Sequence, residues 1–356
     1  MWVHRIVPKH KAVLNLPDNF PVSQRCVDYS YAAYQEVLRI HKENPIDIVQ
    51  SPIWDVEGLA CFMDKNLKTV ISLHTTAKMV FDNYKECDNK DINKIIELET
   101  YLLQNAEYFY ANSKEIVKTI NDKYAIQIPS SKLSIIPHGL VDQSQYYRRN
   151  RHDKTTKILF VGRLEKRKGI DILLETIPYL CEKYLDITFT IIGDDTIKNE
   201  HGIMYKESFY HKNSGKPFLS RVQFTGKVSN EVLYQNYADC DIFVAPSRYE
   251  SFGLIFLEAM MFSKPGIGCN TGGISEVIVD NKNGLLAIAG NVFSLTTTLE
   301  ELIEDREKRK RFGQESRKIY EDKFTVEKMV ENSLNYYLQL CPKNGNSYTI
   351  PIQFMP

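Results

Sequence analysis

Short apolar runs alternate along the whole chain with longer stretches in which apolar residues recur at a helical period. In the first half, strand-like runs lie at residues 46–50, 68–74, 106–112 and 133–139. In the second half, they lie at residues 156–164, 187–195, 221–226, 240–247 and 264–270. Strands that alternate with helices are typical of βαβ units and parallel sheets. The pattern therefore predicts an α/β protein with two doubly wound domains, joined between about residues 140 and 156.

Bulk composition is that of a globular protein and excludes some partners. The 356 residues are 43% hydrophobic and 25% charged, which is ordinary for two domains that each bury a core. Lys plus Arg equals Asp plus Glu at 45 each, so no global charge points to nucleic acid or an anionic membrane. Local basic runs at 146–154 and 307–312 are interpreted as a solvated linker and a solvated helix face.

Cysteine usage and hydropathy predict a cytoplasmic location. The seven cysteines are scattered singly, which fits a reducing compartment better than a disulfide framework or a metal site. No apolar run reaches the roughly 18 residues of a membrane-spanning helix. The N-terminal stretch "MWVHRIVPKHK" does not have the pattern of a signal peptide.

Glycine is unevenly shared between the two halves. Gly58 is the only glycine in the first 138 residues, which leaves 17 − 1 = 16 for residues 139–356. Glycine permits tight turns and close approach of the backbone to a ligand. Ligands of open α/β sheets bind beyond the carboxyl ends of the strands, so we expect the second half to hold a phosphorylated ligand there.

One such strand end, "FVGRLEKRKGI", carries Arg163 and Lys168. Two cations at the start of a helix suit a diphosphate, because the helix N-terminus adds free N–H groups and a partial positive charge. The alternative is solvated charge on a loop, and this is the interpretation favoured for Lys166 and Arg167.

A second strand end, "APSRYESFGLIFLEAM", carries Glu250 on a loop and Glu258 about one and a half turns into the following helix. Carboxylates are poor phosphate ligands but good acceptors for sugar hydroxyls. Backbone amides at the start of that helix could reach a phosphate. The stretch therefore predicts a site in which one carboxylate holds a hexose and the other a ribose. The alternative for Glu258 is an ion pair with a buried Arg or Lys.

Two weaker signals come from glycine loops. Gly226 ends the run "QFTG" before a helix that Ser229 could cap, and main-chain groups of this loop could clasp a nucleobase edge. Gly272 and Gly273 permit close backbone approach before another helix. The neighbouring "GIGCNTGG" lacks the spacing of a dinucleotide-binding loop, which argues against NAD.

Two histidines lie near predicted strand ends. His74 ends "TVISLH" in the first half, and His138 lies in "IPHGL" near the junction. A lone histidine is more often structural, and that is the interpretation for His138. Beside a sugar-phosphate site, His74 is the candidate for contacting the reacting sugar.

Together, "GRLEKRKG", "FTGKV", "APSRYESFGLIFLEAM" and "TGGISEVI" resemble the retaining glycosyltransferases of family 4, which have the GT-B fold. The likeness is strong from about Ile135 to Leu340 and fair from about Ile46. It implies two Rossmann-like domains facing a cleft, and transfer of a sugar from a UDP- or GDP-linked donor with its anomeric configuration kept. The implied parts are an acceptor-side domain (1–145), a nucleotide-sugar-binding domain (146–325), and a helix crossing back onto the first domain with a tail (326–356).

The resemblance also implies roles for single residues. Arg163 and Lys168 would bind the donor diphosphate and stabilise its departure, Glu250 would bind the donor hexose, and His74 would lie close to the reacting sugar. The donor-binding residues implied are Gly226, Lys227, Val228, Phe252, Gly253, Leu254 and Glu258, of which Glu258 holds the ribose. In this family the acceptor attacks from the leaving-group side and the diphosphate takes its proton. That mechanism needs no metal or other cofactor, so Asp194 and Asp195 in "IIGDD" are expected to be loop residues.

The first domain departs from the family pattern. Members usually begin with a strand, a glycine-rich turn and a helix, whereas "WVHRIV" here resembles a later strand of that sheet. The domain is therefore expected to be incomplete, with a sheet edge exposed, unless an upstream segment or a partner chain completes it.

The leading hypothesis is a cytoplasmic glycosyltransferase of polysaccharide biosynthesis, with a nucleotide-sugar as co-substrate. Its acceptor would be a glycan, a lipid-linked glycan or a small molecule, and no nucleic acid is expected as a partner. Peripheral association with a membrane and a partner chain for the first domain are left open. The alternative from another class is a non-catalytic nucleotide-sugar-binding subunit completed by a partner chain. A sugar-nucleotide epimerase would need more acid/base residues than the sequence offers, and ranks last.

Overall fold

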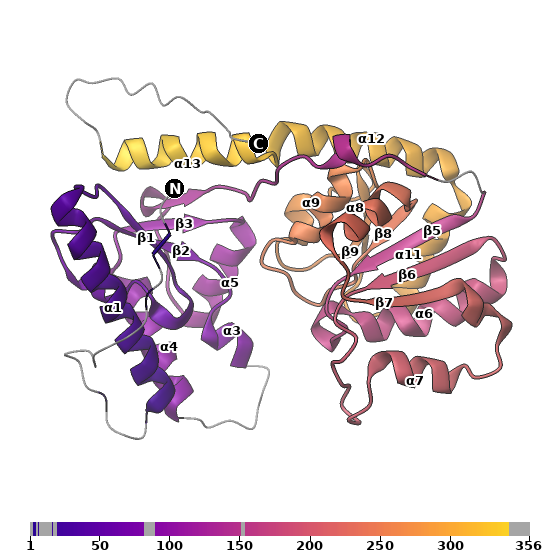
Figure 1. Ribbon diagram of the computed structural model, residues 1–356, viewed down its shortest axis with the longest axis horizontal. Helices are drawn as coiled ribbons and strands as arrows, with labels where there is room; N and C mark the ends of the chain where they lie inside the picture. The colour runs from indigo at the N-terminus through magenta and orange to yellow at the C-terminus, as the bar shows by residue number, and fades with distance from the viewer. Residues whose placement is uncertain are drawn as a thin grey trace. The chain divides into compact units, whose positions relative to one another are not determined.

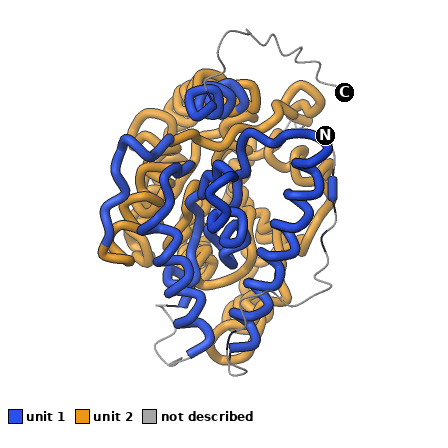
Figure 2. Tube along the Cα trace, turned by 90° about the vertical axis from the view of Figure 1, so that its left-hand side faces the viewer, with its two compact units in different colours: residues 1–110, 126–134, 330–356 blue, residues 111–125, 135–329 orange. Residues whose placement is uncertain are grey.

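The computed structural model of the protein describes residues 3–4, 6, 16, 20–81, 90–150 and 154–341. The chain divides into two compact units, coloured separately in Figure 2. Unit 1 takes in residues 1–110, 126–134 and 330–356, and unit 2 takes in residues 111–125 and 135–329. In the described ranges, no helix is both long enough and apolar enough to cross a membrane.

The first sheet has four strands in the order β1-β2-β3-β4. Its strands are β1 (Val49–Pro52), β2 (Thr69–Leu73), β3 (Tyr108–Ala111) and β4 (Leu133–Ile135). β1 and β2 run in parallel with Val49 opposite Thr69, and β2 is buried along its whole length, as expected of a central strand covered on both faces. The helices of this half of the chain are α1 (Pro21–Glu43), α2 (Leu59–Met63), α3 (Ala77–Phe81), α4 (Lys90–Asn105) and α5 (Lys114–Tyr124).

The second sheet has six strands in the order β10-β9-β8-β5-β6-β7, and its printed pairs are all parallel (Figure 1). Its strands are β5 (Thr156–Val161), β6 (Ile187–Ile192), β7 (Val222–Gly226), β8 (Ile242–Val244), β9 (Gly266–Cys269) and β10 (Gly284–Ala287). The helices are α6 (Ile170–Lys183), α7 (Tyr205–Lys212), α8 (Asn230–Asp239), α9 (Leu254–Met261), α10 (Ile274–Val277), α11 (Val292–Glu304), α12 (Arg306–Lys323) and α13 (Val326–Leu340). The end of α13 belongs to unit 1, where the Tyr336 hydroxyl donates to Phe109 O at 3.0 Å.

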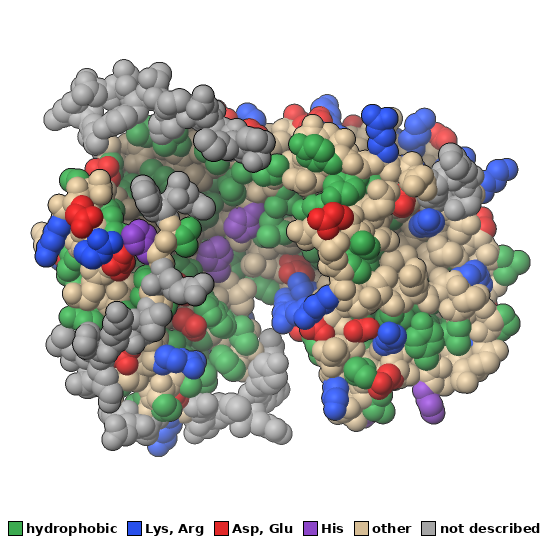
Figure 3. Space-filling model, viewed as in Figure 1, with side chains coloured by type: hydrophobic (Ala, Val, Ile, Leu, Met, Phe, Trp, Pro, Cys, Tyr) green, Lys and Arg blue, Asp and Glu red, His purple; other side chains and the backbone are tan. Residues whose placement is uncertain are grey.

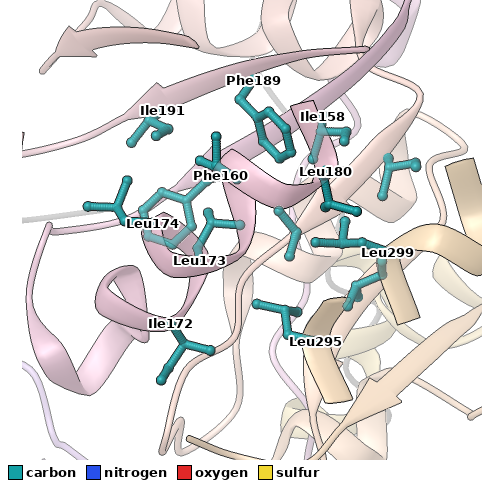
Figure 4. Close-up of a cluster of buried hydrophobic side chains, with 14 of the residues drawn as sticks. Ile158, Phe160, Ile172, Leu173, Leu174, Leu180, Phe189, Ile191, Leu295 and Leu299 are labelled. Atoms are coloured by element: carbon teal, nitrogen blue, oxygen red, sulfur yellow. The ribbon is translucent and has the colours of Figure 1, made fainter. Parts of the chain in front are cut away.

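The main core of unit 2 lies between its sheet and helices α6 and α11. In Figure 4, Phe160 lies beside Leu173 of α6, and Phe189 of the neighbouring strand and Leu299 of α11 belong to the same cluster. All four side chains are at most 2% exposed, and burial of each stabilises the fold by roughly 1.5–3 kcal/mol. This packing fixes the sheet and the directions in which its loops leave.

The predicted α/β fold with two parallel sheets is confirmed, and each predicted apolar run contains or overlaps a strand. The cap predicted at Ser229 is confirmed, because its side chain accepts from Val232 N at the start of α8. Helix α1 and strand β10 were not predicted. Of the strand expected at "WVHRIV", the described residues Val3, His4 and Ile6 are not in a strand, and the other three residues lie outside the described part.

Candidate active site

Chemically reactive side chains of unit 2 gather at the carboxyl edge of its sheet. β5 pairs with β8 and β8 with β9, all in parallel, so the loops that follow these strands leave at the same edge. Figure 3 shows acidic and basic side chains crowded together beside the carboxyl ends of this sheet. Two of the helices that start there, α6 and α9, begin at glycines with left-handed backbone, Gly169 (φ 71°) and Gly253 (φ 98°).

The centre of the site is a pair formed by Lys168 and Glu250. The Lys168 ammonium lies 2.5 Å from Glu250 Oε1, and the two side chains are 16% and 12% exposed. Ser247 Oγ donates to the same oxygen at 2.9 Å. The structure thus brings together two residues that the sequence placed on separate loops, 82 positions apart.

Arg167 also belongs to this cluster, which corrects its interpretation as a solvated charge. Its guanidinium donates to Tyr249 O at 3.2 Å and lies 3.9 Å from Glu250 Oε2. Glu165 Oε1 forms ion pairs with the guanidinium groups of Arg167 (2.9 Å) and Arg163 (3.1 Å). Arg163 is the more exposed of the two arginines, at 58% against 43%, so it lies at the solvent side of the cluster.

Gly272 and Gly273 were predicted to permit close approach of the backbone before a helix. The structure shows such an approach, and what lies against them is the backbone of another loop of the protein. A Cβ on Gly272 would lie 2.1 Å from Glu250 O, and one on Gly273 would lie 2.5 Å from Ser251 O. Gly273 N donates to Glu250 O at 2.8 Å. The glycines therefore let the loop after β9 pack against the loop that carries Glu250, and so hold that carboxylate in place.

Glu258 lies on α9, partly buried, and its partner is a tyrosine. The Tyr237 hydroxyl donates to Glu258 Oε2 at 2.7 Å. Among the described residues Glu258 forms no ion pair with an Arg or Lys, so that alternative is wrong within this part of the chain. Burial raises the pKa of Glu258, and the hydrogen bond from Tyr237 opposes that shift. A carboxylate held in a desolvated place with one neutral donor is ready to accept hydroxyls from a ligand.

Glu258→Gln is expected to stabilise the ligand-free protein at neutral pH. Because the pKa of Glu258 is raised in the folded state, its contribution to stability is present below the unfolded pKa and is lost as pH rises through the folded one. Glutamine removes the buried charge and keeps an acceptor for Tyr237. Denaturant unfolding between pH 4 and pH 8 should show a gain for the variant that grows with pH, and a gain that shrinks as pH rises would contradict this.

The loop after β7 carries the residues expected to flank a base. Gly226 has left-handed backbone (φ 68°), and Val228 packs against the cluster that includes α9. Lys227, which is 76% exposed, forms an ion pair with Asp194 at 2.8 Å, and this holds the pKa of Asp194 well below its ordinary value. Asp194 also accepts from Thr196 N at 3.1 Å, as a loop residue would.

The sequence did not assign His138 or Asn112 to the site, but both support the loop that precedes α9. Phe252 is 3% exposed, and its ring meets that of His138 edge-on at 5.2 Å. The Nε2 atom of His138 lies 3.0 Å from Asn112 Nδ2. Leu254, the first residue of α9, is 42% exposed. His138 thus supports the loop through Phe252.

His74 follows β2 in unit 1. It is partly buried, and burial lowers the pKa of its imidazole, so the ring is neutral at pH 7. Its role at the reacting sugar stays a prediction.

Two family models match the chain and together cover most of it. The model described as glycosyl transferases group 1 matches residues 142–319, and the model described as glycosyltransferase family 4 matches residues 4–143. An uncharacterized glycosyltransferase of Methanocaldococcus jannaschii is 29% identical over 321 residues, 89% of this chain and 82% of the relative. The D-inositol 3-phosphate glycosyltransferase of Corynebacterium diphtheriae is 23% identical over 283 residues, 75% of this chain and 65% of the relative.

Solved structures share the fold at low sequence identity. Sucrose-phosphate synthase from Thermosynechococcus elongatus superposes with a TM-score of 0.74 at 18% identity, over 94% of this chain and 82% of that one. The Anabaena protein HepE, in a crystal structure with UDP-glucose, superposes with a TM-score of 0.66 at 18% identity, over 86% of this chain and 81% of that one.

Proposed function

Since this chain belongs to the glycosyltransferases of family 4, the group 1 glycosyl transferases, we propose that it moves a hexose from a UDP- or GDP-linked donor onto an acceptor, with the anomeric configuration kept. The acceptor is a glycan, a lipid-linked glycan or a small molecule. The chain needs no metal or other cofactor in this proposal. Polysaccharide biosynthesis is the setting we propose.

The observation that carries the proposal is the arrangement of charges at the carboxyl edge of the unit 2 sheet. A cation, Lys168, and a carboxylate, Glu250, hold each other at 2.5 Å in a largely buried place. A second carboxylate, Glu258, lies on the helix that follows Glu250. A nucleotide-sugar has the matching groups, because an anionic diphosphate lies between two rings that carry hydroxyls.

Binding of the donor would exchange one set of partners for another. The diphosphate takes the Lys168 ammonium, with Arg163 and Arg167 near it, and Glu250 then accepts hydroxyls of the hexose. Glu258 accepts the ribose hydroxyls, and the amides at Phe252, Gly253 and Leu254 approach a phosphate at the start of α9.

The groups that assist the reaction are those that stabilise the negative charge on the leaving diphosphate. As the bond from sugar to diphosphate breaks, negative charge grows on the leaving group, and fixed cations nearby stabilise that state more than the ground state. In this proposal the leaving diphosphate takes the proton of the acceptor, Lys227 and Val228 flank the base, and His74 contacts the donor sugar.

Calorimetric titration of the full chain with UDP and with GDP tests the donor site. We expect one nucleotide to bind, and Glu258→Ala to weaken that binding by about tenfold or more, because the ribose hydroxyls lose their acceptor. Glu182→Ala is the matched control, since Glu182 is 58% exposed and pairs with Lys216. If neither nucleotide binds the folded chain, the proposed donor site is wrong.

A turnover assay distinguishes the two functions that are compatible with a nucleotide site, namely a transferase and a non-catalytic binding subunit. A chain that binds the nucleotide and releases it from UDP- or GDP-hexoses in the presence of acceptor is the proposed enzyme. A chain that binds the nucleotide but turns over none of these donors fits a nucleotide-sugar-binding subunit instead.

A further inference from the structure

A pocket lies at the edge of the unit 2 sheet that is opposite the candidate active site. Its volume is about 290 Å³, and its lining includes Cys240 and Asp241, which precede β8, and Pro265, which precedes β9. These positions mark the amino edge, whereas the candidate active site lies at the carboxyl edge. Because the strands are parallel, the two sites are separated by the length of the strands.

The pocket is lined by basic side chains from three distant parts of the chain. Within the described residues, its cations are Arg149, Lys264, Arg306, Arg309 and Lys310, and its one carboxylate is Asp241. Arg149 comes from the first basic run, and Arg309 and Lys310 come from the second. The fold thus brings together two runs that we interpreted from the sequence as solvated, and Arg149 and Lys310 are indeed exposed, while Arg309 is partly buried. In Figure 3, Lys and Arg side chains line α12, whose first turns border the pocket.

Several of these cations are held in place by other groups. Lys264 is 8% exposed and donates to Ala238 O at 2.8 Å. Asp241 Oδ1 accepts from Arg149 at 2.6 Å and Oδ2 accepts from Lys157 N at 2.8 Å, so the backbone fixes the carboxylate that holds the arginine. Arg309 donates to Ile303 O at 2.8 Å, at the end of α11. A buried ammonium uses up to three donors, so Lys264 has capacity for a ligand.

The nearby carboxylates are engaged with the backbone. Asp239 accepts from Asn150 N at 2.8 Å, and Asp305 caps α12 by accepting from Lys308 N at 2.8 Å. The start of α12 is thus already capped by Asp305 and carries Glu307 in its first turn. A bound anion would therefore pair with the basic side chains of the pocket and not with the helix end.

We propose that this pocket is a second anion-binding site, which takes a phosphate group. Guanidinium and ammonium groups that converge on a small hollow are the partners that phosphate oxygens need. The volume suits a compact group, such as a soluble diphosphate or the headgroup of an anionic lipid. The site goes beyond the proposed transfer reaction, because none of its lining residues belongs to the donor site.

The test compares two charge-matched double variants of the full chain. Arg306→Ala/Lys310→Ala removes two exposed cations that line the pocket, and Lys318→Ala/Lys323→Ala removes two exposed cations of α12 that do not. Both are made in a Lys168→Met background, which weakens binding of the probe at the donor site. Inorganic pyrophosphate is titrated by calorimetry, and vesicles of phosphatidylglycerol or phosphatidylcholine are tested by cosedimentation.

We expect the pocket variant to lose at least about tenfold in affinity for one of the two probes, while the control pair stays within about twofold of its parent. A loss for pyrophosphate identifies a soluble phosphate as the ligand, and a loss for phosphatidylglycerol vesicles identifies a lipid headgroup. Equal binding of both probes by the two double variants overturns the proposal. Failure of the Lys168→Met parent to bind either probe also overturns it. UDP and GDP titrations of both double variants in the otherwise unaltered chain report on the donor site separately.

Discussion

Lys168→Met is expected to lower the rate of sugar transfer by about 10²- to 10³-fold, the effect of removing one preorganised charge that stabilises a transition state. The Lys168 ammonium is held at the carboxyl edge of the unit 2 sheet with its side chain only 16% exposed. A charge in such a place acts through a lower dielectric than water and needs no reorganisation when the diphosphate departs. The effect should therefore fall mainly on kcat measured with saturating donor.

Lys166→Met is the control that the chain itself provides. Lys166 lies in the same 3-10 turn and is exposed, so the change in net charge is identical. An exposed charge is screened by solvent, and the rate should stay within about twofold of the parent. Equal rates for the two variants would show that Lys168 does not act on the leaving group.

Loss of Lys168 also affects stability, and the two effects must be separated. Lys168→Met leaves Glu250, 9% exposed, without its ammonium, which is expected to cost about 1–3 kcal/mol of unfolding free energy. Lys168→Met/Glu250→Gln removes both charges and should recover most of that stability. Because it restores no cation at the diphosphate, its transfer rate should remain low.

The fold was readable from the sequence where periodicity was strong. The buried run "TKILFVGRL" predicted β5, whereas the helix expected after residue 326 was implied by the family resemblance and is α13 (Val326–Leu340). Strand β10 was not predicted, and its first residue is a glycine, Gly284. That glycine is required by packing, since a Cβ on Gly284 would lie 2.1 Å from Gly266 O. A sequence shows the glycine but not the neighbouring strand that requires it.

The candidate site was readable as single residues but not as contacts. Lys168 and Glu250 were both singled out, yet their pairing depends on β5 and β8 being neighbours in the sheet. Strand order places the loops side by side, and local patterns do not contain that order. The same reason explains the contacts of Arg167 and the basic pocket, because only the fold brings these distant charges together. Tyr237 gave no signal, because a buried tyrosine on α8 is an ordinary core residue until it meets Glu258.

Gly169→Ala is expected to be among the most damaging single-methyl substitutions in unit 2. Gly169 has left-handed backbone (φ 71°), and an added Cβ would lie 1.9 Å from Pro246 O. The left-handed conformation alone costs an alanine about 1–2 kcal/mol, and forcing a methyl into packed surroundings costs about 1–3 kcal/mol more. We therefore expect a loss of about 2–5 kcal/mol in unfolding free energy, measured by chemical denaturation.

Gly202→Ala separates the two contributions to this loss. Gly202 has nearly the same backbone (φ 75°), but a Cβ there meets nothing within 4 Å, so its substitution reports the backbone term alone, about 1–2 kcal/mol. Equal losses for the two variants would mean that the loop of Pro246 moves aside at little cost. A larger loss at Gly169 would show that this loop is rigid. Because Gly169 directly follows Lys168, and the loop after β8 leads from Pro246 to Glu250, the same rigidity sets the position of the charge pair, and Gly169→Ala should then slow transfer even in the fraction that remains folded.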